Sequence, residues 1–431
     1  MKIGVPKEVV KGEQRVGLVP ETVGKLVDQG HEVLVQRGAG RDYNLDAAYE
    51  EAGARIVPGA GEIYGESEVV LKVQKPTRDE VRAMHEGLTL ICFLQGPAFP
   101  ELAWWLAKAG VTVFSVEAIP RISRAQSMDA LSSMGSISGY KSAIIAANYL
   151  GKYLPMMTTA AGTTRASKVL VLGAGVAGLQ AIATTKRLGA EVTAFDIRPE
   201  VKEQIESLGA TFLDSDDERE EPQEREEQEE YEPAGLAKLM VALGFNSFAE
   251  PPKRETAAQN GDSTKREEQA TATGGYAQEQ SEEKQQRDRE LLRMRLKEMD
   301  VVITTALVPG KRAPILLTRE MIEDMQPGSV IVDLAAENGG NCELTDPGAI
   351  VDHRQVKIIG PVNVPSSVPI HASQLYSRNM LSFINHLAPE GELELDFEDQ
   401  ITDEACIAYG GEIRQEATNR ALAELQEEEA R

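Results

Sequence analysis

The sequence predicts an α/β protein built from two doubly wound domains with a cleft between them. Short apolar runs rich in β-branched residues alternate with helical patterns along much of the 431 residues, which is typical of parallel sheets covered by helices. One apolar run passes directly into a glycine-rich turn and a further helical pattern, the order of a βαβ unit. The length by itself favours about two or three domains.

The most informative pattern lies between Lys168 and Arg198. The apolar run Val169–Leu172 is typical of a strand buried in a parallel sheet. It is followed by Gly173–Gly178, which reads GAGVAG and matches GxGxxG, and then by a helical pattern. A second apolar run, Glu191–Phe195, ends at Asp196. Because strand, glycine turn, helix, second strand and acidic residue occur in the right order and spacing, this stretch predicts a Rossmann-like dinucleotide site.

Each residue type in this stretch has a physical role. Gly173 permits the tight turn out of the strand, and Gly175 allows the backbone to approach a pyrophosphate. Gly178 allows helix and strand to pack closely, and the helix N-terminus stabilises the phosphate charge. Asp196 can accept hydrogen bonds from an adenosine ribose, and its negative charge would repel a 2′-phosphate. The site therefore favours NAD(H) over NADP(H).

Composition narrows the class of protein. A net charge of −24 argues against nucleic acid as a partner. Three widely separated cysteines and five histidines show no metal-binding or disulfide spacing, so we expect no metal site and a reducing compartment. No apolar run approaches the roughly 18 residues of a membrane span, and the N-terminus has no apolar signal segment.

Residues 1–133 are expected to form the first domain, with no GxGxxG after its first strand. Helical patterns lie between the strands, for example at Pro20–Gln29 and Pro100–Ala109. The predicted strands are Lys2–Val5, Glu32–Gln36, Arg55–Val57, Val69–Val73, Thr89–Phe93 and Thr112–Ser115.

A polar stretch, Pro120–Ser133, is predicted to connect the two domains without forming an amphipathic helix. A long helix is expected from Ser138 to Met157, with an apolar stripe of alanines and Leu150. Residues 134–371 would make the second domain, and about 372–431 would return to the first.

Residues 215–272 are predicted to be an acidic, mostly disordered insertion within the second domain, with one short helix at Pro233–Phe248. The chain then resumes with a charged helix at Glu279–Met299. The remaining predicted elements are the strands Ala210–Leu213, Val301–Thr305, Val330–Leu334 and Lys357–Gly360, the helices Thr318–Met325 and Ala372–Leu387, and a hairpin around Gly410-Gly411 before an acidic helix.

Five segments together resemble a known family. They read GVPKE…GEQRVGLVPETV, RISRAQSMD, GAGVAGLQA, ITTALVPGKRAP and DLAAENGGN. They are similar to the alanine dehydrogenase/transhydrogenase superfamily, and within it to the NAD(H)-binding alpha subunit of proton-translocating NAD(P) transhydrogenases. The resemblance covers nearly the whole chain except residues 215–272.

The resemblance implies direct hydride transfer between NADH on this chain and NADP(H) on a partner subunit. The nicotinamide loop would contain Arg121, Gln126, Asp129 and Ser132 in catalytic roles, with Ile122, Ser123 and Arg124 also near the cofactor. Other cofactor contacts would come from Gly173, Ala174, Gly175, Val176, Gly178, Asp196, Ile197 and Arg198, from Gly275 and Tyr276 on a flap, and from Leu307 beside it. Where the family often has a glutamine after this flap, the present sequence has Asp288.

The resemblance also implies partners. This chain would be the first portion of a split alpha subunit, with the membrane-spanning second portion and an NADP-binding beta subunit as separate chains. It would then be a peripheral protein on the cytoplasmic side of the membrane, and the family suggests a homodimer. Hydride transfer between two nicotinamides moves no proton at the reacting carbons, so positioning and water exclusion suffice.

Two alternatives remain. An alanine dehydrogenase on the same scaffold needs an acid/base group, typically histidine in that relative, where this chain has Gln95. Alanine dehydrogenase also has aspartate where this chain has Glu337. Arg15 and Lys72, however, persist at positions that bind a keto-acid carboxylate in alanine dehydrogenase. A structural ion pair is the simpler interpretation of these two residues. The other alternative is a non-catalytic NAD-sensing or assembly module, which the acidic segments would suit.

Overall fold

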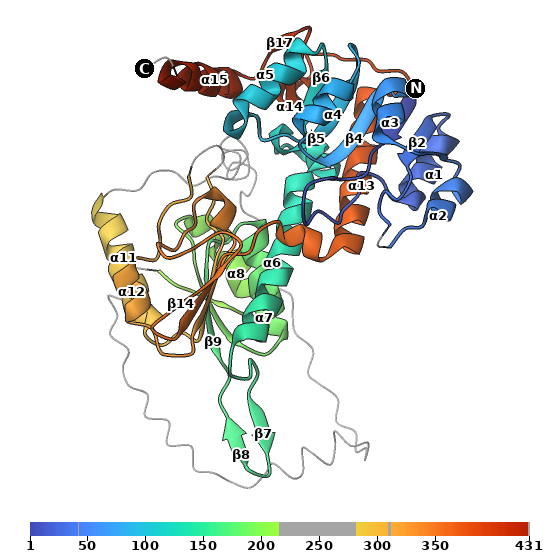
Figure 1. Ribbon diagram of the computed structural model, residues 1–431. Helices are drawn as coiled ribbons and strands as arrows, with labels where there is room; N and C mark the ends of the chain where they lie inside the picture. Colours follow the sequence, from blue (N-terminus) through green and yellow to red (C-terminus); the bar gives the residue numbers. More distant parts are fainter. Residues whose placement is uncertain (42, 215–281, 309–311, 430–431) are drawn as a thin grey trace, which may run out of the picture. The chain divides into compact units, whose positions relative to one another are not determined.

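The computed structural model describes residues 1–41, 43–214, 282–308 and 312–429 (Figure 1). Within them lie two large sheets and one small hairpin, with most strands parallel. The predicted α/β fold class is confirmed in its parallel-dominated sheets. Among the described helices, none combines the length and hydropathy that crossing a bilayer requires.

The first sheet has eight strands in the order β17-β16-β6-β5-β4-β1-β2-β3. Neighbours among β1 to β6 are parallel, whereas β16 runs antiparallel to β6 and to β17. The strands are β1 (Lys2–Val5), β2 (Glu32–Gln36), β3 (Arg55–Val57), β4 (Val69–Gln74), β5 (Thr89–Phe93), β6 (Thr112–Ser115), β16 (Cys406–Tyr409) and β17 (Glu412–Ile413).

Both faces of the first sheet are buried, because alternate strand residues enter different apolar clusters. Leu71 and Val73 pack in one cluster, and Val70 packs in the other. The helices of this region are α1 (Pro20–Asp28), α2 (Asp46–Glu51), α3 (Ala60–Glu66), α4 (Arg78–Ala83), α5 (Pro100–Lys108), α13 (Pro369–Leu387), α14 (Gln400–Ala405) and α15 (Glu416–Glu429).

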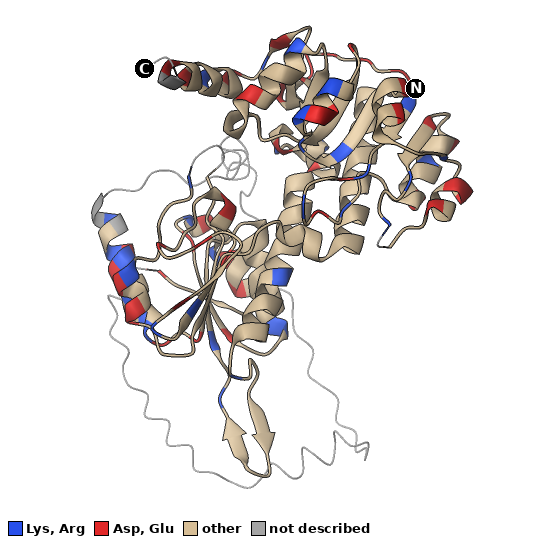
Figure 2. Ribbon diagram, in the orientation of Figure 1, with Lys and Arg blue, Asp and Glu red and all other residues tan. Residues whose placement is uncertain are grey.

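The second sheet has seven strands in the order β11-β10-β9-β12-β13-β15-β14, all parallel except β14. Two apolar clusters again cover its two faces. Its strands are β9 (Lys168–Leu172), β10 (Glu191–Phe195), β11 (Thr211–Phe212), β12 (Val301–Thr304), β13 (Val330–Asp333), β14 (Ile350–His353) and β15 (Val356–Ile359). Its helices are α7 (Val176–Arg187), α8 (Lys202–Ser207), α11 (Glu282–Leu296) and α12 (Arg319–Glu323). Figure 2 shows both signs of charge interspersed along α11.

The connection between the sheets differs from the sequence prediction. A portion of the polar stretch forms a 3-10 helix, Ser123–Met128, and α6 spans Ala130–Tyr149 instead of Ser138–Met157. Met157, the predicted last residue of this helix, instead begins a small hairpin that comprises β7 (Met157–Thr159) and β8 (Gly162–Thr164). The pattern does not reveal the start of α6 because this helix contributes to two different apolar clusters and so has no single apolar stripe.

The antiparallel edge strand β14 is also absent from the prediction. It is joined to β15 by Arg354 and Gln355, whose φ values are 50° and 64°. Two-residue hairpin turns with positive φ favour asparagine and glycine, so an Arg-Gln pair provides no hairpin signal. The predicted insertion at 215–272, its short helix and the flap residues Gly275 and Tyr276 lie outside the described residues.

Candidate functional site

The GxGxxG turn leaves β9 as a tightly packed corner with one open position. Gly173 has φ +97°, and a Cβ there would lie 2.6 Å from Thr305 Oγ1. A Cβ on Gly178 would lie 1.9 Å from the carbonyl oxygen of Gly173. A Cβ on Gly175 would meet nothing within 4 Å. Two glycines are thus required by the fold, whereas Gly175 faces space that a ligand could enter.

This corner lies at the topological switch point of the second sheet. β9 pairs with β10 on one side and with β12 on the other, so successive connections diverge from it. Thr305, directly after β12, donates its hydroxyl to the carbonyl oxygens of Leu172 (3.2 Å) and Gly173 (3.1 Å). Ligands of open α/β sheets bind outside the carboxyl ends of the strands at such a point, next to a helix N-terminus that attracts anions.

Asp196 follows β10, and its carboxylate forms a hydrogen bond with the backbone of the glycine turn. Its Oδ2 accepts a hydrogen bond from the backbone N–H of Ala174 (2.7 Å). Its Oδ1 accepts hydrogen bonds from Nε (2.9 Å) and the backbone N–H (2.9 Å) of Arg198. Burial raises the pKa of this carboxyl, but the hydrogen bonds from Arg198 and Ala174 outweigh burial, so the pKa lies below its ordinary value. The carboxylate stays charged, next to the exposed side chain of Ile197.

The predicted nicotinamide loop is anchored at several points. Asp129 caps α6: its Oδ1 accepts from the backbone N–H of Ser132 (2.7 Å) and its Oδ2 from the Ser132 hydroxyl (2.6 Å). Arg124 forms an ion pair with Asp399, which itself caps α14. Ser127 accepts a hydrogen bond at its carbonyl oxygen from an asparagine of α13. Gln126, between these anchors, is exposed to solvent, as are Arg121 and Ser123, and Ile122 is half-buried.

A buried polar cluster shapes the loops after β12 and β13. Asp333 Oδ2 accepts hydrogen bonds from Thr345 Oγ1 (2.6 Å) and from the backbone N–H of Asn341 (2.8 Å). The Asn341 amide bonds both backbone groups of Ala306, at 3.0 Å and 2.8 Å. It therefore fixes the backbone next to Leu307, whose side chain is exposed. The DLAAENGGN motif contains Asn341, yet no local pattern shows that its side chain bonds to a segment 35 positions away.

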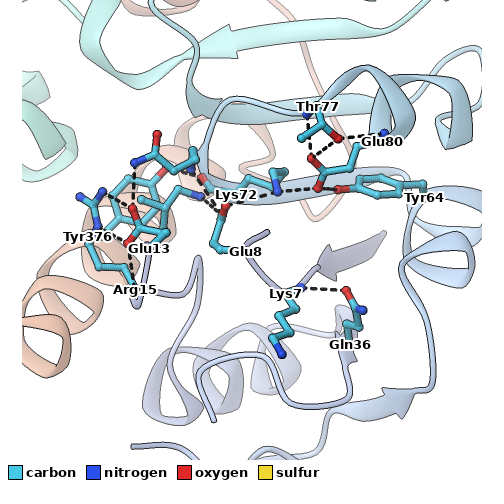
Figure 3. A network of polar contacts seen from close by, with 12 residues as sticks. Lys7, Glu8, Glu13, Arg15, Gln36, Tyr64, Lys72, Thr77, Glu80 and Tyr376 are labelled. Atoms are coloured by element: carbon cyan, nitrogen blue, oxygen red, sulfur yellow. Dashed lines mark hydrogen bonds and ion pairs between the residues drawn. The ribbon is translucent and has the colours of Figure 1, made fainter. Parts of the chain in front are cut away.

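The first sheet has a different arrangement at the equivalent edge (Figure 3). Lys72 is fully buried, with its ammonium 2.7 Å from Glu80 Oε1 and 3.3 Å from Glu8 Oε2. Burial lowers the pKa of Lys72, but Glu8 and Glu80 more than offset this and raise it above its ordinary value. The Tyr64 hydroxyl donates to the same oxygen of Glu80 at 2.6 Å.

Arg15 is neutralised in the same way. Its Nη2 lies 2.6 Å from Glu13 Oε2 and its Nε 2.8 Å from Glu13 Oε1, a two-pronged ion pair, and Nη2 also donates to Asn363 Oδ1 at 2.9 Å. Burial raises the pKa of Glu13, but the contacts with Arg15 outweigh it and lower the pKa to about 2. Both cations that could hold a substrate carboxylate thus already bind carboxylates of the chain.

Gln95 and Glu337, which the resemblance predicts at the positions of a histidine and an aspartate of alanine dehydrogenase, lie on separate loops. Gln95 follows β5 in a left-handed conformation, with φ 57° and an exposed side chain. Glu337 follows β13 and accepts a hydrogen bond from the backbone N–H of Asn363 at 3.1 Å. An uncharged amide such as Gln95 cannot exchange a proton with a substrate near neutral pH. Asp288, at the position of the family glutamine, is a buried residue of α11.

The structure therefore places the predicted residues in two groups. The first comprises the glycine turn, Asp196 and Thr305 at the end of the second sheet, and the second comprises the anchored loop before α6. The fold and the first group define a dinucleotide-binding α/β protein.

The chain belongs to the alanine dehydrogenase/PNT family. Residues 4–138 match the family's N-terminal domain and residues 142–416 its C-terminal domain. It is 41% identical over 421 residues to a Rhodospirillum rubrum protein named as the first portion of NAD(P) transhydrogenase subunit alpha, covering 96% of this chain and 97% of that protein.

Two further comparisons concern a solved structure and the other branch of the family. The crystal structure of a transhydrogenase from Sinorhizobium meliloti superposes with a TM-score of 0.77 at 36% identity, covering 96% of this chain and all of that one. Alanine dehydrogenase of Bacillus subtilis is 27% identical over 433 residues, covering 98% of this chain and 95% of that protein. The predicted resemblance is confirmed, and the identity is higher on the transhydrogenase side.

Proposed function

We propose that the chain is the NAD(H)-binding component of a proton-translocating NAD(P) transhydrogenase. In this role it exchanges a hydride directly with NADP(H) bound to a partner subunit. The observation that carries the proposal is the exposure of Gln126 on a loop that is anchored before it by the ion pair of Arg124 with Asp399 and after it by the hydrogen bond to the Ser127 carbonyl oxygen. An anchored, outward-facing amide suits a reaction that must meet a second nucleotide held by another protein.

The site residues fit a bound dinucleotide. The open position at Gly175 and the first turn of α7 would receive the pyrophosphate, where backbone N–H groups and the helix dipole stabilise negative charge. Asp196 and Ile197 would bind the adenosine end, and Leu307 would lie nearer the nicotinamide. NAD(H) supplies the hydride when it is bound. The protein then positions the ring and excludes water, with no proton to add or remove.

The same proposal explains where the chain works. The Rhodospirillum rubrum relative is named as one portion of a subunit of a larger enzyme. We place this chain on the cytoplasmic side of the membrane, docked to membrane-spanning and NADP-binding chains. A net charge of −24 disfavours direct adsorption to anionic lipid, so protein contacts would hold it there.

Reconstitution tests the proposal. The purified chain is mixed with membranes that contain the candidate membrane-spanning and NADP-binding chains, and hydride transfer from NADH to an NADP analogue is followed by absorbance. We expect transfer that requires both preparations. NADH binding without any transfer would instead favour the non-catalytic NAD-binding module.

Replacing Gln126 tests the loop directly. Gln126→Ala should slow hydride transfer by about 10- to 100-fold, because the amide no longer holds the nicotinamides in register. The NADH dissociation constant, measured by fluorescence, should change by less than about threefold, since the phosphate site is intact. Equal losses in transfer and binding would contradict this role.

The function of an alanine dehydrogenase is disfavoured because the two cations that would bind its substrate carboxylate already pair with carboxylates of this chain. Arg15 and Lys72 already bind Glu13, Glu8 and Glu80, and Gln95 provides no acid/base group. Alanine-dependent NADH production by the purified chain would overturn the choice.

A further inference from the structure

We infer that Gly139, in the middle of α6, is a positioning residue for hydride transfer. It sets how closely α6 approaches the phosphate-binding turn, and α6 in turn carries the nicotinamide loop. This inference rests on the proposed function, because it concerns the distance between the two groups of site residues.

The N-terminal end of α6 is joined directly to the nicotinamide loop. Asp129, a residue of that loop, is also the N-cap of α6, and both of its carboxylate oxygens accept hydrogen bonds from Ser132, a loop residue that lies in the first turn of α6. A capped helix start is rigid, since the cap satisfies an otherwise unpaired backbone N–H. Any displacement of the first turns of α6 therefore moves the loop residues attached to it.

α6 also belongs to two separate apolar clusters. Ala130, Met134 and Ile137 pack in a cluster of the first sheet. Ala146 and Leu150 pack in a cluster of the second sheet. The middle of the helix lies between these two sets, so a displacement at this point shifts the helix against both clusters.

At Gly139 the backbones of α6 and α7 touch. A Cβ on Gly139 would lie 2.0 Å from the carbonyl oxygen of Ala177, 2.8 Å from its carbonyl carbon and 3.0 Å from its Cα. All three atoms are backbone, so no side-chain rotation can relieve the clash. One turn earlier, a Cβ on Gly135 would lie 3.9 Å from Val176 Cβ, which is an ordinary contact.

The α7 side of this contact is the one that cannot yield. Its first turn is held by the close packing of Gly178 on Gly173 O, where a Cβ would lie at 1.9 Å. The turn before it is held by the bond from Ala174 N to Asp196 (2.7 Å) and by Thr305 bonded to Gly173 O (3.1 Å). A methyl group at position 139 should therefore push α6, with the nicotinamide loop, away from the bound pyrophosphate.

The expected displacement is at least about 1 Å, because the 2.0 Å approach must lengthen beyond 3.0 Å before the contact is permitted. A misplacement of about 1 Å between reacting groups can cost on the order of 100-fold in rate. Binding of NADH should suffer little, because its phosphate and adenosine contacts lie on the fixed side. The mutation should thus separate binding from transfer.

The test compares Gly139→Ala with Gly135→Ala in the full chain, reconstituted with the membrane-spanning and NADP-binding chains. Wild-type transfer is measured first, so that its absence would count against the proposed function and not against this inference. We expect Gly139→Ala to bind NADH within about threefold of wild type and to transfer hydride roughly 100-fold more slowly. Gly135→Ala should match wild type in both.

A normal transfer rate in folded Gly139→Ala, or equal losses of binding and transfer, would overturn the inference. If Gly139→Ala does not fold, the series Gly135→Ala, Gly135→Val and Gly135→Leu places side chains of increasing size at the same interface between α6 and α7. Transfer should then fall with side-chain size while the NADH dissociation constant changes much less. A series in which transfer does not change, or follows NADH affinity, would overturn it as well.

Discussion

The two sheets share one strand order and use it in opposite ways. The six strands β3-β2-β1-β4-β5-β6 of the first sheet correspond in order to β11-β10-β9-β12-β13-β15 of the second. In the second sheet, the strand at the switch point leads into a glycine turn with an open position at Gly175. In the first sheet, the loop at residues 6–19 follows β1. Its Glu8 pairs with the buried Lys72, and its Glu13 and Arg15 form a buried ion pair with each other (Figure 3).

The difference shows that topology provides a crevice and the residues after the first strand decide what fills it. In the second sheet, glycines leave room for a pyrophosphate to approach the protein backbone. In the first sheet, Glu8, Glu13 and Arg15 fill the crevice with charges of the chain itself. The filled crevice of the first sheet should therefore contribute to the stability of the fold, and the open crevice of the second sheet should contribute to nucleotide binding. Each prediction below tests one side of that contrast.

The largest effect should come from Lys72. Lys72→Met leaves the buried carboxylates of Glu8 and Glu80 without a cation, which should cost about 3–5 kcal/mol of unfolding free energy. Urea denaturation near neutral pH measures it. Lys25→Met, which removes an exposed pair with Glu21, is the control and should change little. A loss below about 1 kcal/mol for Lys72→Met would refute the structural role of the filled crevice.

Glu13 should produce a pH dependence. Its pKa is about 2 in the folded chain against an ordinary 4.5, so its ion pair stabilises the fold fully above the ordinary value and is lost as the pH falls. Between about pH 6 and pH 3 this loss should reach roughly 2 kcal/mol. Glu13→Gln should lack this component, so its stability should converge on that of wild type at low pH. Parallel pH profiles for the two proteins would count against the assignment.

On the open side, Asp196 should control nucleotide choice. Asp196→Asn removes the negative charge and releases Arg198 from its ion pair, so the affinity for NADPH relative to NADH should rise about tenfold, or roughly 1.4 kcal/mol. Competition binding with both nucleotides measures the ratio. The double variant Asp196→Asn/Arg198→Met should lose most of the gain. Unchanged selectivity in Asp196→Asn would mean that this carboxylate does not face the ribose.

The smallest change in stability is expected at Gly175. Gly175→Ala should leave the free energy of unfolding within about 0.5 kcal/mol of the wild-type value, because the new methyl group meets no protein atom. Its affinity for NADH should fall. Gly17→Ala is its counterpart in the first sheet. There a Cβ would lie 2.6 Å from the carbonyl oxygen of Leu71, so we expect a loss of about 1–3 kcal/mol. Similar stability losses at both positions would remove the contrast between open and filled crevices.

Local patterns are sufficient where the interacting residues are close in sequence. The glycine turn and Asp196 can be identified because a βαβ unit places them within one short stretch. The start of α6 and strand β14 escape prediction because one depends on packing against two clusters and the other on a turn without the usual residues. The sequence leaves the role of Arg15 open between a ligand site and an ion pair, since its contact with Asn363 spans 348 positions.

The sequence by itself determined the α/β class and the NAD(H)-type fingerprint, because periodicity and residue spacing report on local backbone structure. Its motifs also carried the resemblance to the family. Only the tertiary structure decided that Arg15 and Lys72 are saturated by internal carboxylates, and that Gly139 lies against the backbone of Ala177. Those facts depend on which distant segments meet and at what distance. Such contacts arise from packing between segments, which no pattern within a single segment encodes.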